Sequence, residues 1–379
     1  MTQYLTLALA LITTPLVAQP FNLASDEFPI GMYSVDSEGA MKQAREMGIR
    51  YVHTYGMGKD AGPEGIAKDL AYMDLAQKHG LKVMVYLNGR KWVADHGLLE
   101  MHKIVLALKG HPALGFWLFY DEPAGKLTSA ELLPFYWLIK YETPDVPVAI
   151  VEAWTKDWWK TTEVCDILQL DSYPVRDEPF PTAPLGNVTE FIGRAVALES
   201  APIMPVLQCM NWKVMPDYVK SKGIDPNDCR YPSADEIYYW SYSSIAQGTR
   251  GLFWWSYARS IQAGYTWINS TFKEAMLEVR EFVDLVAPAH AAEIFEFAPD
   301  EDVHIAIWDR PAGKHVVLAN GQAIARKISR GTEGRLADGS TLTPWGHTRD
   351  AGATIADGRI TVQAEPWETF VWQLEEPAQ

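Results

Sequence analysis

The chain has 379 residues, of which 48% are hydrophobic and 21% are charged, so it is long and apolar enough to bury a large core. This composition excludes a disordered tail and allows one large domain or a large domain with a smaller one. The 48 acidic residues outnumber the 33 basic ones and give a net charge of −15, which excludes the electrostatic surface expected of a protein that binds nucleic acid or anionic lipid.

The N-terminal residues have the pattern of a secretory signal. Residues 5–17 form an apolar run, and Ala18-Gln19-Pro20 follows it. A run of this length is too short for a membrane span and is typical of a signal peptide, so residues 1–18 are predicted to direct export and to be removed. We therefore expect a secreted or periplasmic protein, with no membrane span in the mature chain.

The three cysteines suggest one disulfide and one buried thiol. Cys209 and Cys229 lie in one loop region and are the better candidates for a pair in an oxidising compartment, whereas Cys165 falls in an apolar strand. No Cys/His cluster has the spacing of a structural zinc site. No metal and no organic cofactor is expected.

Short apolar runs alternate with helix-like segments between residues 28 and 290. The expected strands are residues 29–35, 50–55, 82–88, 114–120, 146–153, 166–173, 203–210 and 251–257. The expected helices between them are residues 39–47, 64–79, 96–109, 129–141, 189–199 and 233–247. This alternation predicts an α/β fold, a (β/α)8 TIM barrel. A doubly wound open sheet is the alternative, but residues 34–38 lack the glycine-rich turn expected after its first strand.

The remaining residues, 295–379, change in character. Apolar or alternating runs at 303–308, 315–319, 360–363 and 368–374 are separated by Gly-containing turns such as Asn320-Gly321 and Asp357-Gly358. They predict a small C-terminal antiparallel β domain, similar to a β-sandwich.

Polar and aromatic residues follow the ends of the predicted barrel strands, where barrel enzymes carry their active sites. These candidate substrate-binding residues are Tyr33, His53, Tyr55, Asn88, Arg90, Glu152, Tyr173, Gln208, Trp255 and Tyr257, with Asp121, Glu122 and Asp171 as candidate catalytic carboxylates. Tryptophans of the following loops can extend the same cleft, namely Trp92, Trp154, Trp158, Trp159 and Trp212, and Trp212 is a further candidate substrate-binding residue. Indole faces stack on sugar rings, and amides and carboxylates bind hydroxyl groups, so this rim indicates a carbohydrate ligand.

The most specific local pattern is the apolar run 114–120 that ends in Asp121-Glu122-Pro123. Pro123 cannot continue the strand, and the resulting bend can bring both carboxylates to the barrel mouth. Two neighbouring carboxylates raise each other's pKa, and a protonated carboxylic acid is what cleavage of a glycosidic bond requires. Alternatively, the pair caps the next helix or binds Arg90.

This stretch resembles the fourth strand of the clan of (β/α)8 retaining glycoside hydrolases, which ends in Asn-Glu-Pro. The resemblance implies that Glu122 is the general acid. Two departures are visible: Asp121 stands where the clan has Asn, and Leu207-Gln208-Cys209 ends the seventh strand where the clan has a nucleophilic Glu. The retaining mechanism would then lack its second carboxylate.

The adjacent Asp-Glu pair also resembles the N-acetylhexosaminidases that use substrate assistance. That resemblance implies that Asp121 orients the acetamido group, that Glu122 is the acid, and that Tyr173 and Trp255 contact the acetamido group. In a third interpretation Asp171 is the second carboxylate, either nucleophile or inverting base. The expected function is a secreted glycoside hydrolase acting on an oligo- or polysaccharide. A non-catalytic carbohydrate-binding barrel is the competing class, and a two-lobed solute receptor is disfavoured by the strand count.

Overall fold

The computed structural model describes residues 27–153, 158–198, 201–286, 293–294, 302–311, 313–332 and 334–377. The predicted signal peptide and Trp154 lie outside the described residues. Among the helices of the described ranges, none is both long and apolar enough to cross a bilayer.

Eight parallel strands close into a barrel in the part of the chain that the structure describes. Each strand pairs with the next along the chain, and the last pairs with the first. The strands are β1 (Ile30–Met32), β2 (Tyr51–Val52), β3 (Lys82–Tyr86), β4 (Leu114–Asp121), β5 (Val148–Ala153), β6 (Ile167–Asp171), β7 (Ile203–Gln208) and β8 (Leu252–Trp255). The predicted fold class is confirmed, and each strand falls inside the range expected for it or within one residue of it.

Helices surround the barrel, and side-chain caps mark the start of several of them. Ser37 caps α2, and Thr128 and Ser233 form capping boxes with Glu131 and Glu236 at the starts of α6 and α9. The helices are α2 (Glu38–Glu46), α3 (Pro63–Lys78), α4 (Gly89–Ala94), α5 (Leu98–Leu108), α6 (Ser129–Glu142), α7 (Gly186–Ala197), α8 (Pro216–Ser221), α9 (Ala234–Ala246), α10 (Tyr257–Gln262) and α11 (Lys273–Val286). Two 3-10 helices, η1 (Trp158–Val164) and η2 (Trp212–Val214), and one π-helical segment, η3 (Ile268–Phe272), are also present among the described residues.

Aromatic side chains fill the interior of the barrel towards the start of its strands. The ring centroid of Phe116 lies 5.6 Å from the ring centroid of Tyr51 and also 5.6 Å from that of Phe253. Gly31 makes room for this packing, because a Cβ atom there would lie 2.0 Å from the ring of Phe253. These side chains fill the interior towards the start of the strands, and catalytic clefts of barrel enzymes lie at the opposite, carboxyl ends.

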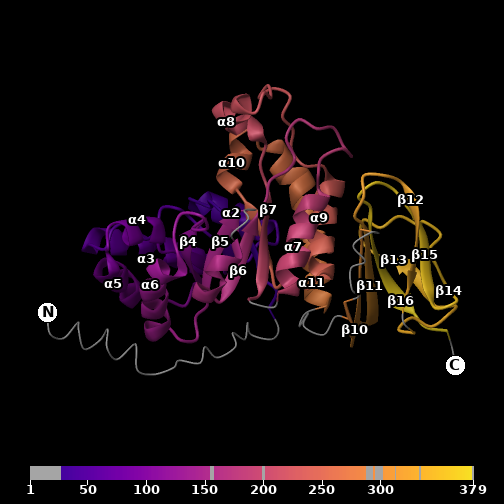
Figure 1. Ribbon diagram of the computed structural model, residues 1–379, viewed down its shortest axis with the longest axis horizontal. Helices are drawn as coiled ribbons and strands as arrows, with labels where there is room; N and C mark the ends of the chain where they lie inside the picture. Colours follow the sequence, from indigo (N-terminus) through magenta and orange to yellow (C-terminus); the bar gives the residue numbers. More distant parts are fainter. Residues whose placement is uncertain are drawn as a thin grey trace.

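Two antiparallel sheets form the C-terminal domain and lie beside α9 and α11, with the three-stranded sheet on the outside (Figure 1). The five-stranded sheet has the order β13-β16-β11-β10-β9 and the other sheet the order β12-β15-β14. The strands are β9 (Glu293–Ile294), β10 (Val303–Arg310), β11 (Gly313–Asn320), β12 (Arg326–Gly331), β13 (Thr341–Pro344), β14 (Thr354–Ala356), β15 (Arg359–Ala364) and β16 (Thr369–Glu375).

The five-stranded sheet is buried on both faces. Ile305 and Leu318 belong to the core between the two sheets, whereas Ala306, Trp308 and Val317 belong to the core of the barrel. The alternation along β10 therefore joins the two units into one body. The four expected strands of this domain are present, and β9, β12, β13 and β14 are additional.

The prediction of a buried thiol at Cys165 is confirmed, and the prediction of a disulfide between Cys209 and Cys229 is wrong. Cys165 is a buried thiol as expected, but Cys209 and Cys229 are also free. Cys209 packs in the core of the barrel, while Cys229 packs in a separate cluster with Met210 and Trp212. Proximity along the chain does not bring the two sulfur atoms together, because the side chains belong to different clusters.

Candidate active site

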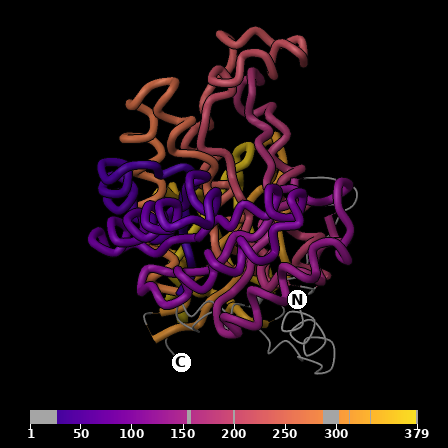
Figure 2. The backbone as a smooth tube through the Cα atoms, turned by 90° about the vertical axis from the view of Figure 1, so that its left-hand side faces the viewer, coloured from indigo at the N-terminus to yellow at the C-terminus, as the bar shows by residue number. Residues whose placement is uncertain are grey.

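A cleft of about 500 Å³ opens at the carboxyl ends of the barrel strands. The segment that contains α8 rises above the barrel on this side, as the views of Figures 1 and 2 agree. Eight predicted site residues line the cleft, namely Tyr33, Tyr55, Asp121, Glu122, Asp171, Tyr173, Trp212 and Trp255. The other lining residues are Val151, Ala153, Ser172, Arg176, Val206, Met215 and Tyr218.

A bulge in β4 directs Asp121 into the cleft. Phe116 faces the barrel interior, whereas Phe119 stacks on Phe135 of α6, outside the barrel. Regular alternation would then place residue 121 outside as well. The register with β5 shifts between Leu118 and Tyr120, so one extra residue reverses the alternation and Asp121 points inward.

Glu122 also reaches the cleft, because the chain turns sharply at this residue. Its φ of 55° is in the left-handed region, which a non-glycine residue occupies at a cost of about 1–3 kcal/mol. Its carboxylate lies 3.6 Å from the ammonium group of Lys126, and 40% of its side chain is exposed. The backbone N–H of Glu122 donates to the carbonyl of Val151, which fixes the turn against β5.

Asp171 ends β6 and is the most strongly perturbed carboxyl group of the cleft. Burial, followed by the charges of Glu122 and Asp121, raises the pKa of Asp171 to about 8. The hydroxyl of Tyr173 donates to its Oδ2 at 3.2 Å, while its Oδ1 is buried without a hydrogen-bond partner. Asp171 therefore holds a proton at neutral pH, and its Oδ1 has no hydrogen-bond partner among the described residues.

Asp121 lies in the same electrostatic environment. The pKa of Asp121 is raised overall, mainly by burial and then by the charge of Glu122. Arg90, the Tyr55 hydroxyl and Lys126 act in the opposite direction. Asp121, like Asp171, is therefore protonated more readily than an exposed aspartate.

Aromatic rings form one wall of the cleft. Tyr173 stacks on Trp255 with ring centroids 5.0 Å apart, and Trp212 stacks on Tyr218 at 4.8 Å. The indole N–H of Trp212 donates to the carbonyl of Tyr173 at 3.2 Å, which ties the two stacks together. Flat apolar faces beside carboxyl groups are suited to pyranose rings.

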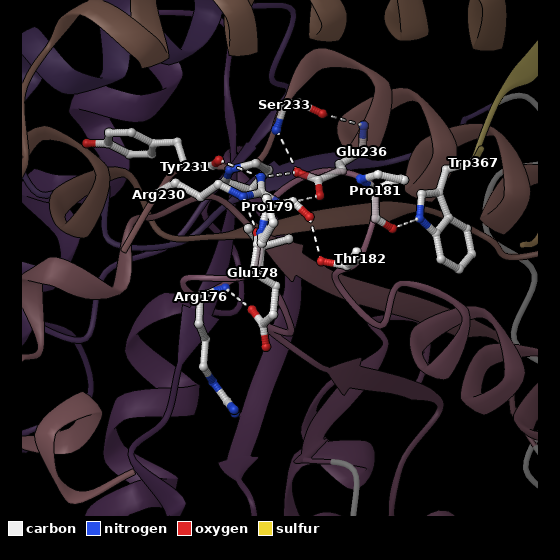
Figure 3. Close-up of polar contacts among 12 residues, drawn as sticks. Arg176, Glu178, Pro179, Pro181, Thr182, Arg230, Tyr231, Ser233, Glu236 and Trp367 are labelled. Atoms are coloured by element: carbon white, nitrogen blue, oxygen red, sulfur yellow. Dashed lines mark hydrogen bonds and ion pairs between the residues drawn. The ribbon is translucent and has the colours of Figure 1, made fainter. Parts of the chain in front are cut away.

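Sequence reasoning missed Arg176, Met215 and Tyr218, which belong to the loops after β6 and β7. Arg176 is held by the loop network of Figure 3, in which its carbonyl accepts from the backbone N–H of Arg230 at 2.9 Å. Arg230 in turn donates to the Glu178 carbonyl and binds both carboxylate oxygens of Glu236 at 2.6 Å. The three residues do not stand at the end of a predicted strand, so the sequence pattern gave no reason to choose them.

Three of the predicted residues are wholly buried outside the cleft. Val151 and Ala153 of β5 face the cleft, so Glu152 between them points to the opposite side of the strand. Its carboxylate accepts hydrogen bonds from the Thr161 hydroxyl and from the backbone N–H of Ala124. The amide of Gln208 bonds both the N–H and the carbonyl of Val175. His53 lies among Tyr33, Tyr55 and Tyr86, and burial lowers its pKa to about 3.

Three further predicted residues lie outside the cleft lining. Asn88 is the N-cap residue of α4, with its side chain 3.4 Å from the hydroxyl of Tyr86. Arg90 donates to the carbonyl of Asp121 at 3.0 Å, and Tyr257 begins α10 with its hydroxyl bonded to Gln43. Of the loop tryptophans, Trp92 and Trp158 are buried and Trp159 is exposed, all outside the cleft lining.

Comparison with known proteins shows similarity in structure only. No protein-family profile and no curated protein matches the sequence. A glycoside hydrolase family 5 protein from Bacteroides vulgatus superposes with a TM-score of 0.64 and 12% identity, over 93% of this chain and 90% of that one. An α-amylase from Anoxybacillus gives 0.60 and 7%, over 94% and 99%. A maltogenic α-amylase from Thermotoga neapolitana gives 0.59 and 10%, over 93% and 100%. The chain therefore has the fold of these glycoside hydrolases along nearly its whole length.

Proposed function

We propose that the protein is a glycoside hydrolase that cleaves an oligo- or polysaccharide in the cleft at the barrel mouth. The observation that carries this proposal is the convergence of Asp121, Glu122 and Asp171 on a cleft with an aromatic wall. Hydrolysis needs one carboxylic acid that protonates the leaving oxygen and one carboxylate that acts on the anomeric carbon or on a water molecule. Both kinds of group are available there.

We assign the proton donor to Asp171. Its carboxyl group has a pKa near 8, and its Oδ1 is buried without a partner. In the reaction the glycosidic C–O bond breaks and the leaving oxygen takes the proton of Asp171. Water supplies the hydroxyl group at the anomeric carbon, and its other proton passes to a carboxylate of the cleft, which restores the total number of protons held there.

Glu122 then supplies the carboxylate. The resemblance to the retaining clan implies the acid role for Glu122, but its ion pair with Lys126 and its partial exposure favour the opposite division of labour. Asp121 interacts with Tyr55 and Arg90 and would orient the reacting groups. No carboxylate from β7 is among the described residues that line the cleft, so Glu122 has no competitor on that strand.

A Glu122→Gln substitution tests the proposal. Reducing ends released from a panel of oligosaccharides by the full-length protein should fall about 10²-fold or more, because the amide can act neither as base nor as nucleophile. Glu190→Gln makes the same chemical change in α7, where Glu190 pairs with Arg194, and should retain the full rate.

The alternatives give distinct outcomes in the same assay. Binding without turnover in the wild type and in both variants would show a carbohydrate-binding barrel and contradict the proposal. Nuclear magnetic resonance of the first-formed anomer reports retention or inversion. Turnover confined to 2-acetamido sugars would indicate substrate assistance, with Asp121 orienting the acetamido group.

A further inference from the structure

The guanidinium group of Arg176 is a cation without an ionic partner in the cleft. It lies over the ring of Trp212, 5.7 Å from the ring centroid, and its Nε is buried without a hydrogen-bond partner. In Figure 3 its side chain extends away from the carboxylate of Glu178, which binds the backbone N–H of Arg176 instead. No carboxylate among the described residues forms an ion pair with it.

The loop holds Arg176 in place through contacts on both sides. The side-chain amide of Gln208 accepts a hydrogen bond from the backbone N–H of Val175, the residue before Arg176, at 2.9 Å and donates one to its carbonyl at 2.7 Å. The carbonyl of Arg176 accepts from Arg230, whose guanidinium is fixed by the buried carboxylate of Glu236. A side chain on a loop fixed in this way is preorganised, so little conformational entropy is lost when it binds a ligand.

The charge of Arg176 is not used by the catalytic carboxyl groups. The cations that act on Asp121 are Arg90 and Lys126. Arg176 instead belongs with Trp212 and Tyr218, and Lys222 lies 5.5 Å from the ring centroid of Tyr218. This wall of the cleft therefore combines stacked rings with positive charge.

We propose that Arg176 and Trp212 form a subsite for an acidic sugar unit, one that carries a carboxylate or a sulfate group, next to the unit whose bond is cleaved. The ring of that unit would stack against the aromatic wall, and the planar guanidinium would bind the anion through paired N–H donors. The inference deepens the proposed function and rests on it for the reaction, but the binding itself is measured separately.

The test compares ligands that differ only in charge. Uronic-acid oligosaccharides are paired with their methyl esters, and sulfated oligosaccharides with their desulfated forms. Affinities are measured by titration calorimetry for the full-length wild type, Arg176→Gln, Arg176→Lys and, as a matched control on the outer face of α7, Arg194→Gln. We expect the acidic member of one pair to bind about 10- to 100-fold more tightly to the wild type, as a charge-assisted hydrogen bond allows.

The variants should separate the role of charge from that of shape. Arg176→Gln should abolish the preference and leave the affinity for the neutral ligand, Arg176→Lys should restore it only in part, and Arg194→Gln should retain it. The pair that shows the preference identifies the anion as carboxylate or sulfate. A wild type that binds no acidic ligand better than its neutral partner, or a preference that survives in Arg176→Gln, overturns the inference. Charge-selective binding without any hydrolysis would uphold this subsite and contradict only the proposed function.

Discussion

Replacing Asp171 by asparagine is expected to slow the hydrolysis of a natural glycosidic bond by about 10²- to 10⁴-fold, the range typical of a lost general acid. The amide cannot give a proton to the leaving oxygen. An aryl glycoside with a dinitrophenolate leaving group needs no such proton, so its cleavage should be slowed far less. The ratio of the two rates, measured for the wild type and for Asp171→Asn, identifies the proton donor.

The dependence on pH provides a second measurement of the same role. With the pKa of Asp171 raised to about 8, the acid is protonated below this value, and kcat/KM of the wild type should fall as the pH rises through about 8. Asp171→Asn should lack this basic limb. If Glu122→Gln and not Asp171→Asn shows the leaving-group dependence, the acid is Glu122, as the resemblance to the retaining clan implies.

Loss of activity in Asp171→Asn should not come from unfolding. The folded state holds the proton of Asp171 up to about pH 8, whereas the unfolded chain releases it near pH 4, so this group lowers the stability of the fold as the pH rises between these values. Asparagine removes that effect. Thermal unfolding at pH 8 should therefore show the variant to be at least as stable as the wild type.

The largest loss of stability is expected from Arg230→Gln, with a decrease of about 3 kcal/mol in the free energy of unfolding. Glu236 is fully buried and binds both terminal nitrogens of Arg230, which is 25% exposed. The substitution leaves an uncompensated carboxylate in the interior. Urea denaturation followed by fluorescence of the tryptophans measures the change.

Two controls separate this effect from the general loss of a charge. Arg194→Gln breaks an exposed pair within α7 and should change the free energy of unfolding by less than about 0.5 kcal/mol. The double variant Arg230→Gln with Glu236→Gln buries no unpaired charge, and glutamine can still complete the capping box with Ser233. It should recover part of the loss, and a double variant less stable than either single variant would contradict the argument.

The sequence predicted correctly those structural elements that have a distinct local pattern of residues. The apolar run that ends at Asp121-Glu122-Pro123 marked the end of β4, and the apolar run before Asp171 marked the end of β6. The helices α4, α8, α10 and α11 were not expected, although the last has a clear apolar face. The strands β9, β12, β13 and β14 were missed because short strands at the edge of a small domain carry little apolar pattern.

Side-chain directions could not be predicted in the same way. Alternation along β4 gives the wrong face for Asp121, because the bulge between Leu118 and Tyr120 adds a residue that no composition signal reveals. The expected pairing of Cys209 with Cys229 failed for a related reason, since the two side chains enter different clusters.

The barrel, the C-terminal β domain and the strand ends that carry carboxyl groups could be predicted from the sequence, because the periodicity of apolar residues within each segment is a local property. Which of those groups meet depends on the folded chain. It turned Asp121 inward and Glu152 outward, and it brought Arg176 from a loop to the cleft beside Trp212. These outcomes depend on contacts between residues that are distant along the chain, and such contacts leave no pattern within one segment.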